Sequence, residues 1–147
     1  MKLFLDTNIL LDLLLERNGF EESAEIIEMS NEGKCQLFVS SLTMVNIAYV
    51  YQKTVGQEAI IPNLKLISSL MEVLPLSGDD IEHSYYLDGR DFEDTIQAVC
   101  AARAGCDFII TRNSKDFEIG QGLGAPLILP AVHKPSSFLK RIQRSGD

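Results

Sequence analysis

The sequence predicts an α/β protein with a central parallel sheet and helices on both faces, a three-layer α/β/α arrangement. Two observations favour this class. Short apolar runs alternate along the chain with longer helical patterns, and the runs are continuously apolar instead of alternating apolar with polar residues. Continuous runs are typical of strands that are covered on both faces. With 147 residues, of which 46% are hydrophobic, we expect one domain over residues 1–147.

The first half of the chain is expected to contain two strands and four helices. Ser41 or Thr43 is the expected N-cap of the helix after the second strand. In the preceding helix Ala24 and Ile27 are expected to face inward, with Ile26 as a further candidate. In chain order the predicted elements are a strand at 2–6, a helix through 9–14, a helix at 21–31 that stops near Gly33, a strand at 36–41, a helix ending near 53 and a helix at 58–72.

The second half continues the alternation. Asp79 or Asp80 is expected to open a helix that contains Tyr85 and Tyr86, and Asp91 is expected to cap the next one. In chain order we predict a strand at 73–77, a helix ending near Gly89, a helix at 91–105, a strand at 107–111, a weaker strand at 125–130 and a short helix at 135–142.

Cysteine usage and the N-terminus predict a cytoplasmic protein. The three cysteines form no CxxC pair, and an odd number does not suit a disulfide framework. Asp6, Asn8 and Asp12 interrupt the first apolar run well before the roughly 20 residues that a membrane helix needs. No small-residue cleavage site follows an unbroken apolar stretch. We therefore expect no membrane segment and no signal peptide.

The net charge of -8 argues against a nucleic-acid partner, because proteins that bind nucleic acids usually carry a basic surface. Carboxylates that converge on bound cations would reverse the local field. Positive charge does gather near the C-terminus. A solvated helix face is the preferred interpretation of this group, and a phosphate-contacting edge is the alternative. Its members are Lys134, Lys140, Arg141 and Arg144.

Acidic and amide side chains are expected at one edge of the sheet. Ligands of open parallel sheets bind beyond the carboxyl ends of the strands. Asp6 follows the first strand, and Asn113 and Asp116 follow the strand at 107–111. Asp91 and Asp94 are three residues apart at a helix start and therefore share one face. These positions predict four acids in one cleft.

Such a cluster predicts a divalent metal site. Carboxylates that lie together repel one another unless a cation compensates them. Mg²⁺ and Mn²⁺ prefer oxygen ligands, and in pairs they clamp the attacking and leaving oxygens of a phosphodiester. Each acid also has a structural explanation when taken alone. Asp91 and Asp6 are suitable helix caps, and Glu93 and Asp94 complement a helix dipole.

Other chemistries have weaker support. His83 and His133 are the only histidines, and no serine lies in a GxSxG setting, so a hydrolytic triad is not predicted. Cys100 and Cys106 are interpreted as core residues. The glycines at 120, 122 and 124 are not followed by GK[ST], which excludes a phosphate-binding P-loop and leaves a flexible loop as the interpretation. Arg112 and Lys115 flank Asp116, where exposed surface charge is the default interpretation and RNA phosphate contact the alternative.

Four segments in order resemble the motifs of PIN domains. They are FLDTNILLDLL, SSLTMVNIAYVYQK, DFEDTIQAVCAARAGCDFIITRNSKDF and LILPAVHKPSSFL, and together they span nearly the whole chain. The resemblance implies an α/β/α fold with a parallel sheet and metal-dependent ribonuclease activity, as in the VapC-type toxins that belong to this family.

The resemblance also assigns roles to residues. Asp6, Asp94 and Asp116 match the family's acids and are the expected catalytic residues, and Asp91 is an additional acid of the DFED variant. The expected ligands of Mg²⁺ or Mn²⁺ are Asp6, Asp91, Asp94, Asp116, Asn46 and Asn113.

Two positions depart from the family's pattern. Asn46 stands where PIN nucleases usually carry a glutamate, and Asn113 stands where many relatives carry an aspartate. An amide donates an oxygen but no charge, so both exchanges should weaken cation binding. Asn46 also has a second interpretation, as a partly exposed helix residue of no consequence.

The leading hypothesis is therefore a metal-dependent endoribonuclease with a weakened site, the toxin of a toxin-antitoxin pair. Its expected partners are single-stranded or structured RNA, an antitoxin protein and a second copy of the chain, because helical segments around IAYVYQK and Tyr85 carry aromatic residues suited to an interface. The main alternative is a catalytically impaired PIN fold that binds RNA or protein. A haloacid dehalogenase-type phosphatase is disfavoured, because Asn8 stands where that class needs a second aspartate.

Overall fold

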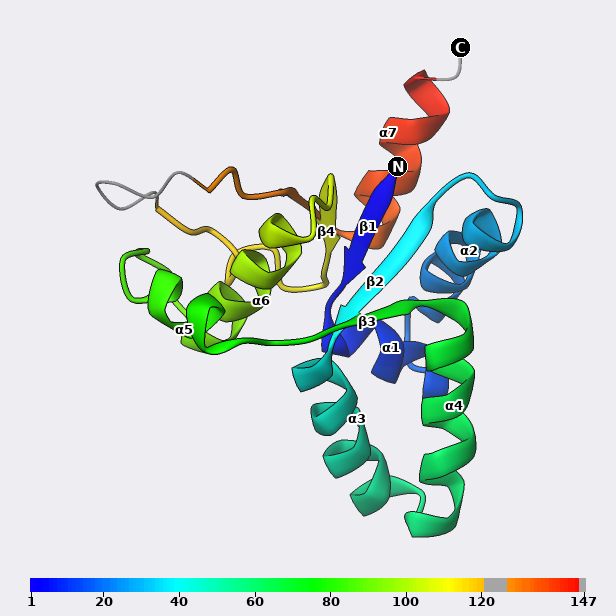
Figure 1. Cartoon of the computed structure of the whole chain (residues 1–147). Coiled ribbons are helices and arrows are strands. Elements are labelled where there is room, and N and C mark those ends of the chain that lie inside the picture. Colours follow the sequence, from blue (N-terminus) through cyan, green and yellow to red (C-terminus); the bar gives the residue numbers. More distant parts are fainter. Residues whose placement is uncertain (121–126, 146–147) are drawn as a thin grey trace.

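A five-stranded parallel sheet forms the centre of the molecule, as the sequence predicts (Figure 1). The computed structural model describes residues 1–120 and 127–145. The strand order is β3-β2-β1-β4-β5, which places β1 in the middle. The strands are β1 (Lys2–Leu5), β2 (Gln36–Ser40), β3 (Glu72–Leu74), β4 (Phe108–Ile110) and β5 (Ala131–His133).

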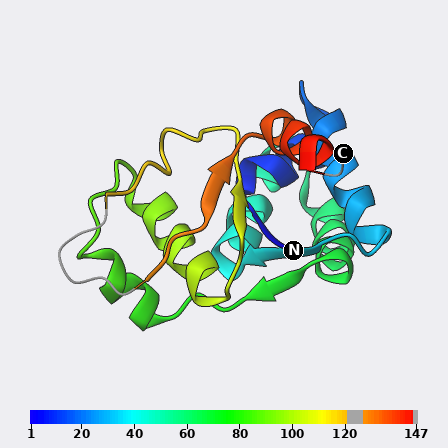
Figure 2. The same cartoon turned by 90° about the horizontal axis from the view of Figure 1, so that it is seen from above.

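Helices cover both faces of this sheet and confirm the three-layer α/β/α class. Figure 2 shows α5 and α6 on one side, with α2 and α7 on the other. The helices are α1 (Thr7–Leu14), α2 (Phe20–Asn31), α3 (Ser41–Thr54), the short 3-10 helix η1 (Gln57–Ala59), α4 (Ile60–Leu70), α5 (Gly78–Ser84), α6 (Phe92–Arg103) and α7 (Pro135–Ser145). Within residues 1–120 and 127–145, none of them has the length and apolar character that a membrane crossing requires.

Two apolar clusters fill the space between the layers. Successive residues of a strand point to opposite faces, so Leu3 and Leu5 of β1 enter one cluster and Phe4 enters the other. The first cluster contains side chains of α1, α2, α3, α4 and α7, and the second is built against α6. Leu3, Phe4 and Leu5 are all fully buried, which explains why they form a continuous apolar run.

Several predicted cap positions and boundaries were wrong. The N-cap of α3 is Ser40, whose hydroxyl accepts from the backbone of Thr43, so neither Ser41 nor Thr43 caps it. The N-cap of α5 is Ser77 instead of Asp79 or Asp80, and α5 ends at Ser84. Serine competes well for cap positions because its side chain reaches the free amides of the first turn.

Tyr85 and Tyr86 consequently lie beyond the end of α5. The strand predicted at 73–77 is the shorter β3 at Glu72–Leu74, which also takes Glu72 out of the preceding helix. Residues 127–130, the described part of the strand predicted at 125–130, form no strand, and β5 lies at Ala131–His133. Residues 121–126, with two glycines of the predicted flexible loop, lie outside the described residues.

In α2 the inward side agrees with the prediction at Ile26 and differs from it at Ala24. Ser23, Ile26 and Met29 are buried, whereas Ala24 is exposed. Ile27 packs partly buried against the first apolar cluster.

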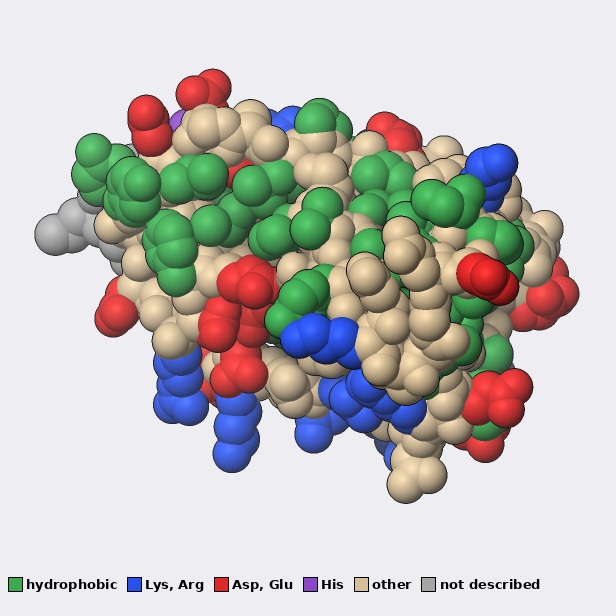
Figure 3. All heavy atoms as spheres, turned by 90° about the horizontal axis from the view of Figure 1, so that it is seen from below, with side chains coloured by type: hydrophobic (Ala, Val, Ile, Leu, Met, Phe, Trp, Pro, Cys, Tyr) green, Lys and Arg blue, Asp and Glu red, His purple; other side chains and the backbone are tan. Residues whose placement is uncertain are grey.

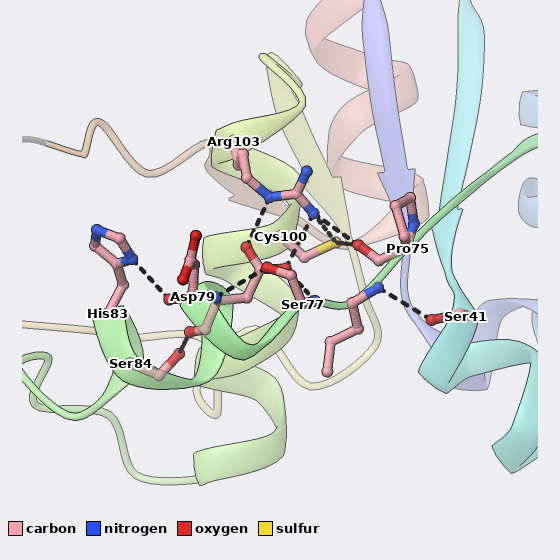
Figure 4. Close-up of polar contacts among 10 residues, drawn as sticks. Ser41, Pro75, Ser77, Asp79, His83, Ser84, Cys100 and Arg103 are labelled. Atoms are coloured by element: carbon pink, nitrogen blue, oxygen red, sulfur yellow. Dashed lines mark hydrogen bonds and ion pairs between the residues drawn. The ribbon is translucent and has the colours of Figure 1, made fainter.

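An ion pair between Arg103 and Asp80 fixes α5 against α6 (Figure 4). Asp80 is almost fully buried, and its two oxygens accept from Arg103 Nε at 2.7 Å and Nη2 at 3.0 Å. The same Nη2 donates to the carbonyl of Pro75 at 2.7 Å, and Ser77 and Asp80 form a capping box. A buried carboxylate with this many donors is fully compensated. The network holds the helix pair that carries part of the functional site.

Candidate active site

One cavity of about 330 Å³ collects every residue predicted for the metal site. It lies at the carboxyl ends of β1 and β4, the place expected for ligands of an open parallel sheet. The predicted residues among its lining are Asp6, Asn46, Asp91, Asp94, Asn113 and Asp116. They come from the ends of two strands and from α3 and α6, so the fold brings together positions more than 100 residues apart.

Asp6 occupies the turn between β1 and α1 and is 4% exposed. Its Oδ1 accepts from the backbone of Thr7 at 2.7 Å, which makes Asp6 the N-cap of α1. Its Oδ2 accepts from the hydroxyl of Thr111 at 2.8 Å, just after β4. Burial raises the pKa of Asp6, against the lowering effect of these two hydrogen bonds. The capping interpretation is therefore correct, and the same carboxylate also faces the cavity.

Asp91 and Asp94 have different roles at the start of α6. Asp91 Oδ1 accepts from the backbone of Asp94 at 3.0 Å, so Asp91 is the N-cap of this helix, as expected, while it also lines the cavity. Burial raises the pKa of Asp94 to about 7, with further contributions from the charges of Asp6, Asp91, Asp116 and Glu93. The negative charges of these carboxylates repel one another, and a bound cation would remove that repulsion.

Asn46 is in contact with a carboxylate that the sequence did not assign to the site. Its Nδ2 donates to Glu93 Oε1 at 2.6 Å, which joins α3 to the first turn of α6. Glu93 also lines the cavity. From the sequence, Glu93 was expected only to complement the helix dipole. Its position between Asp91 and Asp94 was the available signal, because residues of one helix turn surround the same helix end.

A buried polar network lies beneath the cavity and was not predicted. Gln97, one turn after Asp94, is fully buried. Its Oε1 accepts from the hydroxyl of Ser40 at 2.6 Å, and its Nε2 donates to Thr43 Oγ1 at 3.2 Å. Thr43 Oγ1 is in turn 3.1 Å from Thr7 Oγ1. The network ties α6 to β2, α3 and α1, and so fixes the elements that carry Asp94 and Asp6 relative to each other.

The donor chemistry of the cavity fits Mg²⁺ or Mn²⁺. Its polar lining offers carboxylate and amide oxygens, with neither thiol nor imidazole among the lining residues. Within residues 1–120 and 127–145, no three acidic, histidine or cysteine side chains already converge tightly enough to hold one ion. The carboxylates therefore line a shared cavity and are spaced around it.

The remaining predicted features are structural. Cys100 and Cys106 are buried in the second apolar cluster, as expected, and Cys35 is buried in the first. His133 is the last residue of β5, where it packs against Phe108 and Phe138 and does not line the acidic cavity.

The chain belongs to the PIN domain family, because the family model described as PIN domain matches residues 2–115. A search of curated proteins finds Ribonuclease VapC1 of Aquifex aeolicus (strain VF5), which is 28% identical over 122 residues, 79% of this chain and 83% of that protein.

Solved structures share the fold over most of their length. A toxin-antitoxin complex from Klebsiella pneumoniae is 25% identical, with a TM-score of 0.60 over 92% of this chain and 98% of that one. VapBC2 from Rickettsia felis, solved with a DNA fragment from its promoter, has a TM-score of 0.67 at 17% identity and covers 91% of this chain and 98% of its own. VapC20 of Mycobacterium tuberculosis, described as a toxin that cleaves the sarcin-ricin loop, has a TM-score of 0.56 at 13% identity, over 73% of this chain and 86% of that one.

Proposed function

We propose that the protein is a Mg²⁺- or Mn²⁺-dependent endoribonuclease, the toxin of a toxin-antitoxin pair. The observation that carries the proposal is the cavity that Asp6, Asp94 and Asp116 line together at the carboxyl ends of the strands. The similarity to a protein named as a VapC ribonuclease supports the same activity. We expect the protein to act in the cytoplasm.

Three carboxylates, those of Asp6, Asp94 and Asp116, are the proposed catalytic residues and principal ligands. Asp91, Asn46 and Asn113, which line the same cavity, are the proposed further oxygen ligands. When bound, the cations supply stabilisation for the negative charge that develops on a phosphodiester under attack. The hydrogen bonds from Thr111 and Thr7 fix the orientation of the Asp6 carboxylate for its proposed role as a metal ligand.

The amides at positions 46 and 113 make this site weaker than an all-carboxylate one, because an amide oxygen brings no charge to the cation. Glu93 partly compensates at position 46. Asn46 holds its carboxylate by a hydrogen bond of 2.6 Å at the cavity wall. We therefore include Glu93 among the residues that contribute negative charge to the cations.

A second candidate function is a PIN fold that binds RNA or protein without cutting. Two uncharged positions and a spread set of carboxylates favour it. Manganese titration followed by an RNA cleavage assay separates the two functions, because only the nuclease cleaves RNA when its cation is bound. A catalytic variant such as Asp94→Asn is the necessary control.

An antitoxin is the proposed protein partner, and an apolar groove between α1, α2 and α4 supports it. The groove encloses about 260 Å³, and its size and apolar walls suit one face of an amphipathic helix. It is lined by Leu10, Leu13, Leu14, Ala24, Ile27, Leu66, Ile67, Leu70 and Met71. The solved structures with this fold include toxin-antitoxin complexes.

A homodimer is the proposed assembly. Tyr49, Tyr85 and Tyr86 are each more than half exposed, so they do not line the core. Tyr85 stacks on Phe92 with ring centroids 5.8 Å apart and an interplanar angle of 6°. Exposed aromatic side chains are enriched at protein interfaces, which supports a contact between two copies of the chain.

A further inference from the structure

A second polar pocket of about 270 Å³ adjoins the acidic cavity and has the opposite charge. Its lining consists of Arg112, Asn113, Ser114, Lys115, Asp116 and Lys134. Asn113 and Asp116 also line the acidic cavity, so the two spaces have a common wall. Three cationic side chains meet one carboxylate here, in a chain whose net charge is -8.

Arg112 is held in this pocket by a buried carboxylate. Its Nε lies 3.0 Å from Oδ2 of Asp12, which is fully buried on α1. Burial raises the pKa of Asp12, while the charges of Arg112 and Arg17 lower it. A charge in the interior needs a close counter-charge, so Asp12 fixes the direction of the guanidinium group. The Arg112 side chain is still 41% exposed, which leaves its outer N–H groups open to the pocket.

The two lysines bring charge that the protein does not use elsewhere. Lys115 follows β4 and Lys134 follows β5, so neighbouring strands place both at the same edge of the sheet. Both are exposed, and neither forms an ion pair with a carboxylate in residues 1–120 and 127–145. The need to neutralise the buried Asp12 explains the presence of Arg112 in this pocket. It does not explain why Lys115 and Lys134 line the same pocket.

We propose that this pocket binds a backbone phosphate of the RNA substrate, one that flanks the phosphodiester held at the acidic cavity. An arginine fork, two ammonium groups and the Ser114 hydroxyl are the donors that a phosphate takes. Figure 3 shows acidic side chains grouped on the face at the carboxyl ends of the strands, with Lys and Arg side chains beside them. An RNA strand that crosses the wall shared by the two spaces would contact both the acidic cavity and the basic pocket. The inference rests on the proposed ribonuclease function, whose substrate it positions.

The test is a salt titration of binding to a short single-stranded RNA, with Ca²⁺ in place of Mg²⁺ to prevent cleavage. We expect Lys134→Gln and Lys115→Gln each to weaken binding roughly fivefold at moderate salt. Each should also reduce the slope of log K against log salt by about 0.7, the value for one lost phosphate contact on a single strand. Lys65→Gln is the matched control, because Lys65 is exposed on α4 and lines neither pocket. Equal affinities and slopes for all four proteins would overturn the proposal.

A set of RNAs, each with one uncharged methylphosphonate linkage, locates the contact. We expect one linkage position at which the wild type loses affinity and Lys134→Gln loses nothing further. A Lys134→Gln defect of the same size with every RNA would mean diffuse attraction and would overturn the pocket. Cleavage by the wild type with Mn²⁺ is measured separately. Failure of cleavage contradicts the ribonuclease, whereas failure of the binding pattern contradicts the pocket.

Discussion

Asn46 and Glu93 face each other across the wall of the acidic cavity, with Asn46 Nδ2 donating to Glu93 Oε1 at 2.6 Å. The contact links α3 to the first turn of α6, the two helices that carry this side of the site. The side-chain amide of Asn46 thus holds the carboxylate of Glu93 in place. Asn46 is a partly exposed helix residue that lines the cavity and makes this contact, and its effect on cation binding stays a prediction.

Asn46→Glu should bind Mn²⁺ about tenfold more tightly and make the metal-free protein less stable. The new carboxylate adds a charged oxygen ligand, and without metal it repels Glu93 where a hydrogen bond stood. Calorimetric titration gives the affinity, and thermal unfolding with and without Mn²⁺ gives the stability. Gln52→Glu, on an exposed position of the same helix, adds the same charge away from the cavity and should change neither. Unchanged Mn²⁺ affinity in Asn46→Glu would place this side chain outside the metal site.

Glu93→Gln should weaken Mn²⁺ binding severalfold while leaving the fold intact. The substitution removes one charge from the cavity and keeps the shape of a side chain that is exposed at the protein surface. Calorimetry measures the loss. Glu82→Gln on α5 is the control, because Glu82 is exposed and does not line the cavity. An affinity equal to that of the wild type would show that Asn46 binds Glu93 for structural reasons alone.

The ion pair between Asp80 and Arg103 should make stability depend on acid pH. Burial of Asp80 favours its protonated form, but the hydrogen bonds from Arg103 and Ser77 outweigh burial and leave its pKa below the ordinary 3.8. A lowered carboxyl pKa contributes stability that is present above the unfolded-state pKa and is lost as pH falls through the folded-state pKa. Urea unfolding from pH 6 down to pH 3 should therefore show a steeper loss in the wild type than in Asp80→Asn.

Arg103→Met should cost about 3 kcal/mol at neutral pH, because it leaves the buried Asp80 carboxylate without its counter-charge. Arg90→Met is the matched control. Arg90 is exposed, and its pair with Glu118 at 4.0 Å lies at the surface, where such pairs contribute little. Equal destabilisation in the two variants would show that the network of Figure 4 does not fix α5 on α6.

Sedimentation should show a dimer at micromolar concentration, and Tyr85→Ser should shift it toward the monomer. Tyr85 is 65% exposed and stacks on Phe92, so its removal takes aromatic area from the proposed interface without opening the core. Leu66→Ser on α4 is the control, because Leu66 is also exposed and lies away from Tyr85 in the sequence, and it should leave the dimer unchanged. Tyr51 is buried, so its substitution would disturb the core and cannot serve as a control. A monomeric wild type would contradict the dimer.

Continuous apolar runs made the sheet predictable. The side chains of Leu3, Phe4 and Leu5 are fully buried on opposite faces, so the order of strands and helices could be predicted from hydrophobic pattern alone. Strand β5 was missed because its burial pattern is exposed and intermediate, as at the edge of a sheet, and the more apolar stretch before it was preferred. Caps were missed at Ser40 and Ser77, where a neighbouring residue was an equally suitable candidate.

The acids of the site could be predicted because Asp6 directly follows β1, Asp91 and Asp94 lie at the start of α6, and Asp116 lies in the loop after β4, all at the same edge of the sheet. Contacts between distant segments could not. Glu93 reaches Asn46, and Asp12 reaches Arg112, across separations that no local pattern records. Gln97 reads as an ordinary polar residue in an amphipathic helix, and only the packing of α6 against β2 and α3 buries it among hydroxyl groups.

RNA cleavage in the presence of Mn²⁺ tests the proposed ribonuclease most directly. A labelled single-stranded RNA is incubated with the wild type and with Asp94→Asn, each with Mn²⁺ and with excess EDTA, and circular dichroism checks that both proteins are folded. We expect cleavage only by the wild type and only with Mn²⁺, because Asp94 lines the cavity together with Asp6, Asp91 and Asp116 and its carboxylate is a proposed principal ligand. Intact RNA with a folded, Mn²⁺-saturated wild type, or equal cleavage by Asp94→Asn, would contradict it.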